Sequence, residues 1–163
     1  MKNSVKAIIF DWGDTVMRDF NLPGPMYLWE SVDWIPGAET TLKYLSSKYP
    51  CIIATSADHS KTSDMIAALK RIGADVYFDH FYSHIELGVK KPDPEFFIRT
   101  ARLSGYDQKT CLMVGNLYDK DIVGAKEAGM VTVFFNELGL KGSFPKADYT
   151  IQHMSELTPL FDE

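Results

Sequence analysis

Short apolar runs that alternate with helix-length amphipathic stretches constrain the fold of this chain most strongly. The runs that favour strands are 5–10, 51–55, 81–83, 111–114 and 131–135, and 149–152 is expected as an edge strand. The stretches that favour helices are 38–49, 60–73, 94–104 and 119–128, and Ser155 is a candidate cap for a final short helix. Buried strands that alternate with helices are typical of a parallel sheet with both faces covered. We therefore expect one α/β domain over 1–163, a Rossmann-like three-layer α/β/α sandwich.

The composition is that of an ordinary globular chain and excludes several classes of partner. A length of 163 residues, with 45% apolar and 24% charged residues, fits one domain. The net charge of -5 gives no basic surface for nucleic acid or for an anionic membrane. No apolar stretch reaches the length of a secretion signal or a membrane span, so we expect a cytoplasmic protein. Cys51 and Cys111 lie inside apolar runs, where we expect buried free thiols.

Polar residues with different chemistry follow the ends of the expected strands. Asp11 follows the first strand, Thr55 and Ser56 end the second, and Asn116 follows the strand at 111–114. Lys91 stands just before the helix that begins at 94. Ligands of parallel α/β sheets bind beyond the carboxyl ends of the strands. A carboxylate, two hydroxyls, an amide and an amine at one rim therefore predict a site, and the alternative is that these residues simply begin loops.

The order and spacing of these residues resemble the four motifs of the haloacid dehalogenase superfamily, over residues 5 to about 135. The first motif reads Asp11-Trp12-Gly13-Asp14-Thr15 and the second Thr55-Ser56; the third is Lys91-Pro92-Asp93-Pro94, and the fourth is Gly115-Asn116 followed by Asp121. Each motif alone is a weak signal, whereas all four in order are specific. The resemblance implies a HAD-like fold and a phosphatase-type hydrolase.

The resemblance implies a magnesium-dependent hydrolase of phosphate monoesters. Phosphoryl transfer needs an in-line nucleophile and neutralised phosphoryl oxygens. In the family, the carboxylate at the position of Asp11 attacks phosphorus and forms an aspartyl-phosphate. Thr55 and Lys91 would complete the catalytic set. Lys90 is the competing lysine, and the position directly before the Pro-Asp-Pro sequence favours Lys91.

The resemblance also assigns the groups that would bind phosphate and Mg²⁺. The phosphate-binding residues would be Trp12, Thr55, Ser56 and Lys91, and the metal ligands would be Asp11, the Gly13 backbone carbonyl and Asn116. Oxygen ligands of this kind suit Mg²⁺. Asp121 and Asp14 would lie just outside these direct ligands, where Asp121 would orient metal waters or Lys91. A plain helix-start aspartate is the alternative for Asp121.

Two positions depart from the family pattern. Gly13 stands where the family has the aspartate that protonates the leaving alcohol and then activates water. General acid–base catalysis contributes about 10²- to 10⁴-fold, so we expect a slow phosphatase or one selective for good leaving groups. Asp14 is one residue too late to be a simple substitute. Asn116 stands where aspartate is usual, which removes a negative charge and predicts weaker Mg²⁺ binding.

The chain has no insertion long enough for a folded cap domain. Only 16–36, called the flap segment below, separates the first motif from the first helix, so we expect an open site. Its stretch 22–35 is apolar for a loop. It is expected either to fold back on the mouth of the sheet or to form a homo-oligomer contact that covers the site.

Two other functions compete with the phosphatase. Gly13 and Asn116 are the features that favour a degenerate member of the family, which would bind phosphate or a partner without turnover. Carbon–halogen hydrolysis also uses an aspartate nucleophile, but it needs a closed apolar pocket, which a chain without a cap does not provide. The leading prediction remains hydrolysis of small or larger phosphorylated substrates, with Mg²⁺ as cofactor.

Overall fold

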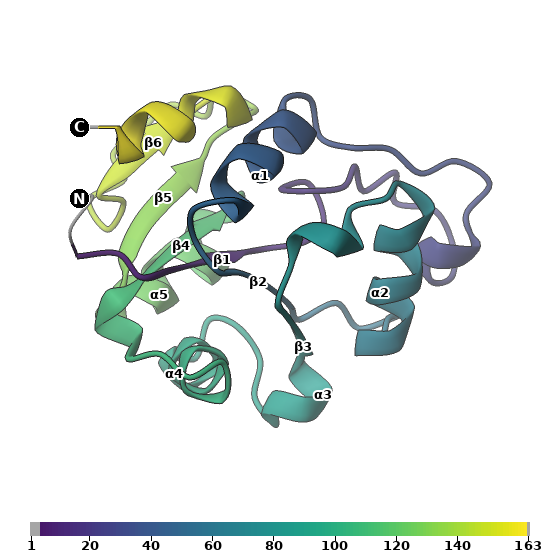
Figure 1. Cartoon of the computed structure of the whole chain (residues 1–163), viewed down its shortest axis with the longest axis horizontal. Coiled ribbons are helices and arrows are strands. Elements are labelled where there is room, and N and C mark those ends of the chain that lie inside the picture. Colours follow the sequence, from purple (N-terminus) through teal and green to yellow (C-terminus); the bar gives the residue numbers. More distant parts are fainter. Residues whose placement is uncertain (1–3, 163) are drawn as a thin grey trace.

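A parallel six-stranded sheet forms the centre of the protein in the computed structural model, which describes residues 4–162 (Figure 1). Its strands are β1 (Ala7–Phe10), β2 (Cys51–Thr55), β3 (His80–Ser83), β4 (Cys111–Gly115), β5 (Val131–Phe135) and β6 (Tyr149–Ile151). The strand order is β3-β2-β1-β4-β5-β6, and every neighbouring pair is parallel. From β1 to β3 successive strands are added toward one edge of the sheet, and from β4 to β6 they are added toward the other edge. The crevice at this reversal is where such sheets bind ligands.

Helices cover both faces of the sheet, which confirms the expected three-layer sandwich. In Figure 1, α1 (Ala38–Ser46) and α2 (Thr62–Arg71) lie on one side of the sheet, and α3 (His84–Leu87), α4 (Pro94–Leu103) and α5 (Gly124–Glu127) lie on the other. Short 3-10 helices span Met26–Leu28, Asp75–Tyr77, Gln108–Thr110, Met154–Glu156 and Thr158–Phe161. No helix within 4–162 has the length and apolarity needed to cross a membrane.

Strand β1 shows how the sheet supplies two hydrophobic cores. All its residues are buried, and successive side chains point to opposite faces. Ile8 and Phe10 belong to the core beneath α1 and α2, whereas Ile9 belongs to the core beneath α4 and α5. Cys51 and Cys111 are buried free thiols, as expected, and burial raises the pKa of Cys51 to about 12 and that of Cys111 to about 11. Both thiols are therefore core residues and not reactive groups.

Three local features differ from the sequence prediction. The expected helix at 119–128 starts as a π-helix at Tyr118–Val123 and becomes α-helical only at α5. Ser155 lies inside the 3-10 helix Met154–Glu156 and does not cap it, because His153 is the cap and its side chain accepts from the Ser155 N–H. Helix α3 is not among the expected helices, although Ser83 and Glu86 form a capping box that the sequence shows as Ser-x-x-Glu.

The flap segment folds back over the carboxyl end of the sheet and contains no cap domain. Isolated bridges join Met17 to Gly13 and to Trp34, so the two ends of the segment lie close together. Met26, Trp29 and Ile35 are buried in the core on the α2 side. Most of the large apolar side chains of 22–35 thus pack within the chain, while Leu22 and Leu28 are exposed. A homo-oligomer contact through this stretch stays a prediction.

Arg71 ties the flap segment to the end of α2. Its guanidinium donates to the backbone carbonyls of Trp29, Tyr27 and Glu30. Charge-assisted hydrogen bonds are worth about 1.5–3 kcal/mol each at most, and less at an exposed site. We expect Arg71→Ala to leave the sheet intact and to speed hydrogen exchange at the hydrogen-bonded Leu28 and Trp29 amides by about 10-fold. Lys70→Ala, on the same exposed turn, is the control, and equal exchange in both variants would contradict the role of Arg71.

Candidate active site

An open pocket lies at the carboxyl ends of β1, β2 and β4, where the topology predicts a ligand site. Its volume is about 350 Å³. The end of β1 supplies 11–13, the turn after β2 supplies 55–60, and the flap segment supplies Asp19, Asn21 and Leu22 among others. Lys91 and the loop after β4 complete the wall. The tertiary structure therefore brings three of the four motifs into this pocket, and part of the fourth.

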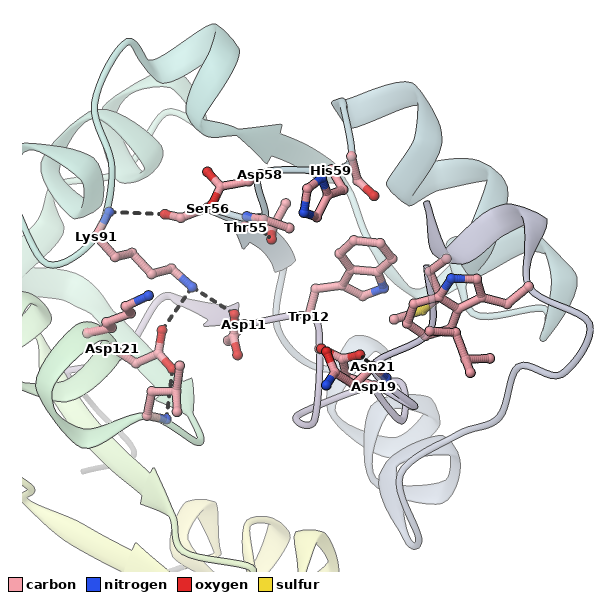
Figure 2. A pocket seen from close by; sticks show the side chains of 18 of the residues that line it. Asp11, Trp12, Asp19, Asn21, Thr55, Ser56, Asp58, His59, Lys91 and Asp121 are labelled. Carbon is pink, nitrogen blue, oxygen red and sulfur yellow. Dashed lines mark hydrogen bonds and ion pairs between the residues drawn. The ribbon is translucent and has the colours of Figure 1, made fainter. Parts of the chain in front are cut away.

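Asp11, Lys91 and Asp121 form a buried charged cluster at the base of the pocket (Figure 2). The Lys91 ammonium lies 2.7 Å from Asp11 Oδ1 and 2.8 Å from Asp121 Oδ1. The Lys91 side chain is only 3% exposed. A buried cation between two carboxylates is held in one position, because any movement would leave a buried charge unpaired.

The charges of this cluster control one another's protonation. Burial disfavours the Lys91 ammonium, but the negative charges of Asp11 and Asp121 outweigh it, so the pKa of Lys91 is raised above its ordinary value. Burial raises the pKa of Asp121 to about 6, and the negative charge of Asp11 adds to this effect, while Lys91 opposes it. Lys91 is therefore a permanent cation in the pocket, beside the carboxylate of Asp11.

Two glycines allow Asp121 and Lys91 to approach the site. A Cβ atom added to Gly115 would lie 2.5 Å from the Asp121 side chain, so only glycine at the end of β4 leaves room for it. A Cβ atom at Gly124 would collide with the Pro92 carbonyl oxygen, next to Lys91. The π-helical turn completes the placement, since Asp121 Oδ2 accepts from the Leu117 N–H at 3.1 Å. Turns of this type often occur at functional sites.

Lys91, and not its neighbour Lys90, points into the site. The Lys91 N–H donates to Ser56 Oγ at 3.0 Å, which ties the turn after β2 to the start of the α4 loop. Asp93 then caps α4 by accepting from the Glu95 N–H, and Pro94 occupies the first helical turn, as the sequence predicts. Lys90 is exposed and pairs with Asp58 at the rim.

The other expected phosphate-binding groups also line the pocket. Thr55 is buried at the end of β2, and its Oγ1 accepts from the Ala57 N–H at 3.0 Å, which leaves the hydroxyl hydrogen free to donate. Trp12 forms part of the wall, but its indole N–H points to Met17 Sδ at 3.2 Å. A contact from Trp12 to phosphate would therefore come from the backbone N–H and not from the ring.

Asp11 and Asn116, two of the expected metal ligands, both lie close to the hydroxyl of Thr15. Thr15 Oγ1 lies 3.2 Å from Asp11 Oδ2 and 3.4 Å from Asn116 Oδ1. Within 4–162 no three His, Cys, Asp or Glu side chains cluster closely enough to hold a metal ion. A site here needs an amide oxygen and a backbone carbonyl in addition to Asp11. Asn116 and Gly13 offer these groups, and hard oxygens of this kind fit Mg²⁺.

Asp14 does not line the pocket that contains Asp11. Its backbone lies in the left-handed region, with φ 57°, and its Oδ1 accepts from the Asp19 N–H at 3.0 Å. It also pairs with Arg18 and lines a neighbouring hollow with Asn116. Burial is the main cause that raises the pKa of Asp14, with a further contribution from the charge of Asp19, while the Asp19 N–H opposes it. Its expected place outside the metal ligands stays a prediction, and its visible role is to shape the loop that carries Asp19.

The pocket also contains residues that the motifs did not indicate. Asp19 and Asn21 from the flap segment, and Lys120 from the π-helical turn, line it. No spacing rule in the sequence places these residues near Asp11. The polar residues Arg18, Asp19 and Asn21, close after the first motif in an otherwise apolar segment, are the weak signal that the sequence carries.

Known phosphatases are among the relatives of this chain. A glyceraldehyde 3-phosphate phosphatase from Pyrococcus furiosus is 32% identical over 134 residues, which cover 78% of this chain and 54% of the relative. A ribulose-1,5-bisphosphate 5-phosphatase from Halopiger xanaduensis is 29% identical over 142 residues, which cover 80% of this chain and 58% of the relative. The chain thus spans about half the length of the curated relatives it matches.

Solved structures share the fold over nearly the whole chain. A HAD phosphatase from Thermococcus onnurineus has a TM-score of 0.81 at 23% identity, covering 96% of this chain and 97% of the other. An uncharacterised protein from Listeria monocytogenes serotype 4b has a TM-score of 0.82 at 23% identity, covering 97% and 99%. A family model described as haloacid dehalogenase-like hydrolase matches residues 26–129, a range that contains Thr55, Lys91 and Asn116. The chain therefore belongs to the haloacid dehalogenase-like hydrolase family.

Proposed function

We propose that this protein is a Mg²⁺-dependent hydrolase of phosphate monoesters that works through an aspartyl-phosphate at Asp11. The observation that carries the proposal is the environment of the Asp11 carboxylate at the base of an open pocket. Oδ1 lies against the Lys91 ammonium, and Oδ2 faces the position shared with Thr15 and Asn116. A carboxylate held between a fixed cation and a candidate metal site can attack a phosphoryl group whose charge is neutralised from both sides.

The other residues would hold the phosphoryl group in line with Asp11. The Thr55 hydroxyl and the Ser56 backbone N–H would donate to its oxygens, and Lys91 would neutralise them. Asp121 keeps the Lys91 ammonium directed at the site through the ion pair at 2.8 Å. Mg²⁺ held by Asp11, the Gly13 carbonyl and Asn116 would supply positive charge for the phosphoryl oxygens.

Small phosphorylated metabolites are the substrates that the pocket supports best. Its volume of about 350 Å³ is in the range of small-molecule sites. Relatives named for glyceraldehyde 3-phosphate and ribulose-1,5-bisphosphate act on phosphorylated compounds of this size class. Because no cap domain closes the pocket within residues 4–162, a phosphate group on a larger molecule would also have access.

A panel of phosphate esters tests the function. We expect purified protein to release inorganic phosphate from at least one small phosphorylated compound in the presence of Mg²⁺, and to lose this release in EDTA. Release that does not depend on Mg²⁺ would contradict the proposal. The panel should include sugar phosphates, nucleoside monophosphates, acyl phosphates and p-nitrophenyl phosphate, since leaving groups of different quality also report on acid catalysis.

A phosphate-binding or partner-binding protein without turnover is the second candidate. Gly13 favours it, because no carboxylate at that position can protonate a leaving group or activate water. If no other group replaces that carboxylate, we expect the rate of turnover to be about 10²- to 10⁴-fold lower for substrates whose leaving group needs a proton. Only substrates with good leaving groups would then be hydrolysed at a useful rate. Retained phosphate binding, with no release from any substrate in the panel, would support this second candidate over the first.

Asn116 predicts a weak metal site that one substitution should strengthen. Asn116→Asp adds a negative charge beside Asp11 Oδ2, which strengthens attraction to Mg²⁺. We expect the Mg²⁺ concentration for half-maximal effect to fall by about 10-fold, equivalent to about 1.4 kcal/mol. The measurement is a magnesium titration by calorimetry, or of activity where turnover is sufficient. Asp119→Asn, a charge change at an exposed residue three positions away, is the control. Unchanged affinity in Asn116→Asp would contradict this metal position.

A further inference from the structure

The Asp19 carboxylate borders the region that a side chain at position 13 would enter. A Cβ atom built on Gly13 would lie 3.7 Å from Asp19 Cβ and 3.8 Å from Asp19 Oδ2, and those are its nearest neighbours. These are ordinary van der Waals separations, so the Gly13 side of the pocket is open to a side chain. The flap segment thus places a carboxylate beside the backbone position where this chain lacks one.

Asp19 shares the pocket with the nucleophile. It lines the same cavity as Asp11, Thr55 and Lys91. Figure 2 shows Asp19 and Asn21 beside Trp12, on the side of Asp11 opposite to Lys91. In an in-line displacement the leaving oxygen lies on the side of phosphorus opposite to Asp11, in the cavity that Asp19 also lines. The Asp58 carboxylate and the His59 ring lie by Thr55 instead, on the β2 side.

The loop that carries Asp19 is held by several contacts. The Asp19 N–H donates to Asp14 Oδ1 at 3.0 Å, and Asp19 Oδ1 accepts from the Asn21 N–H at 2.8 Å. Arg18, the preceding residue, donates to both carboxylate oxygens of Glu137 at 2.7 and 2.9 Å, which anchors the loop to the segment after β5. One oxygen of Asp19 is thus fixed by the chain, and the other, Oδ2, is the oxygen near Gly13.

We propose that Asp19, supplied by the flap segment, is the catalytic general acid and base that Gly13 cannot provide. The proposal rests on the function proposed above and adds a residue to it. It also accounts for Asp14, whose turn and side chain hold the Asp19 backbone in place. The loss of the carboxylate at position 13 is then a relocation of the proton-transfer group by six residues along the chain.

The proton transfers balance over two steps. In the first, Asp11 attacks phosphorus, the bond from phosphorus to the leaving oxygen breaks, and the Asp19 carboxylic acid gives its proton to that oxygen. The products are a free alcohol, the aspartyl-phosphate and an Asp19 carboxylate. In the second, water attacks phosphorus, Asp19 takes one of its protons, and the bond from phosphorus to Asp11 breaks. Inorganic phosphate leaves, and both aspartates return to their starting states.

Leaving-group dependence in Asp19→Asn provides the test. Glycerol phosphate has a poor leaving group that needs a proton, whereas p-nitrophenyl phosphate has a good one that does not. We expect Asp19→Asn to lower kcat/KM for glycerol phosphate by about 10²- to 10⁴-fold and that for p-nitrophenyl phosphate by less than about 10-fold. We also expect a burst of about one p-nitrophenol per enzyme, because Asp19 is missing when water must attack the aspartyl-phosphate.

Two further variants separate proton transfer from charge and from structure. Asp58→Asn removes an exposed carboxylate from the same pocket rim, and it should change kcat/KM for both substrates by the same factor. Gly13→Asp combined with Asp19→Asn returns a carboxylate to the open position at Gly13. This double variant should have a kcat/KM for glycerol phosphate at least about 10-fold above that of Asp19→Asn, and it should show no burst.

The outcomes distinguish the inference from the proposed function. Two results with Asp19→Asn would overturn the role of Asp19: an equal fall in kcat/KM for both substrates, or the same ratio of the two kcat/KM values as in the wild type with no burst. In either case, Mg²⁺-dependent turnover would still support the phosphatase. Wild-type protein that already strongly prefers p-nitrophenyl phosphate, with no further change in Asp19→Asn, would overturn it as well and would favour uncompensated loss at Gly13. No Mg²⁺-dependent turnover in the wild type would overturn the proposed function and this inference together.

Discussion

Asp11→Asn is expected to abolish Mg²⁺-dependent phosphate release, lowering kcat/KM by about 10⁴-fold or more, as loss of a nucleophile does in other covalent catalysts. The amide has nearly the same shape as the carboxylate, but its nitrogen and oxygen are poor nucleophiles. The substitution also removes the negative charge between Lys91 and the candidate metal site. The aspartyl-phosphate can then no longer form.

Folding should survive this substitution, so the loss of activity can be assigned to chemistry. Lys91 keeps its ion pair with Asp121, and the oxygen of the new amide can still accept from the Lys91 ammonium. We expect the free energy of unfolding to change by less than about 1.5 kcal/mol. The measurements are steady-state phosphate release and trapping of the phosphorylated enzyme by acid quench. Asp58→Asn is the control for charge at the pocket, and retained turnover in Asp11→Asn would refute the assignment of the nucleophile.

Lys91→Met is expected to destabilise the protein and to stop catalysis together. The substitution leaves Asp11 and Asp121 as neighbouring carboxylates with no buried cation between them. Breaking a buried ion pair by removing one partner costs about 3–5 kcal/mol, because the remaining charge is uncompensated. Turnover should fall by about 10²-fold or more through loss of the positive charge at the phosphoryl oxygens.

The exposed neighbour provides a matched control for this substitution. Lys90 pairs with Asp58 at the surface, and Lys90→Met should change the free energy of unfolding by less than about 0.5 kcal/mol. Denaturant unfolding measures both variants. The double variant Lys91→Met/Asp121→Leu should recover much of the lost stability without recovering activity. Similar stabilities for Lys91→Met and Lys90→Met would contradict the buried cluster.

The destabilisation in Lys91→Met should depend on pH. Burial and the charge of Asp11 already raise the pKa of Asp121 to about 6 in the folded protein, and removal of Lys91 removes the cause that opposes this shift. Asp121 therefore binds a proton more readily in the folded state than in the unfolded chain. The variant should be most stable below about pH 4, and it should lose stability as the pH rises from there through the folded-state pKa of Asp121, at about 6 or higher. A deficit that grows toward low pH would contradict this account.

Some of the fold and the site followed directly from the sequence. The strands at 51–55 and 131–135 have the predicted bounds, because uninterrupted apolar runs in parallel sheets admit few alternatives. The start of α4 was equally readable, since Asp93 and Pro94 are local signals. The π-helical turn before α5 was not readable. It depends on the contact between Gly115 and Asp121, and on the Leu117 N–H, which only the folded chain brings together.

The candidate site, like the fold, could be predicted from the sequence only in part. Sequence by itself determined the family. It also indicated Asp11 and Thr55 at the strand ends and Lys91 before α4, because motif order and the ends of parallel strands are properties of the linear chain. It also showed that Gly13 lacks a carboxylate. Only the tertiary structure decided what faces that gap. Asp19 reaches it because the flap segment folds back, held by Arg71 and by the pair between Arg18 and Glu137, and long-range contacts of this kind have no local sequence signature.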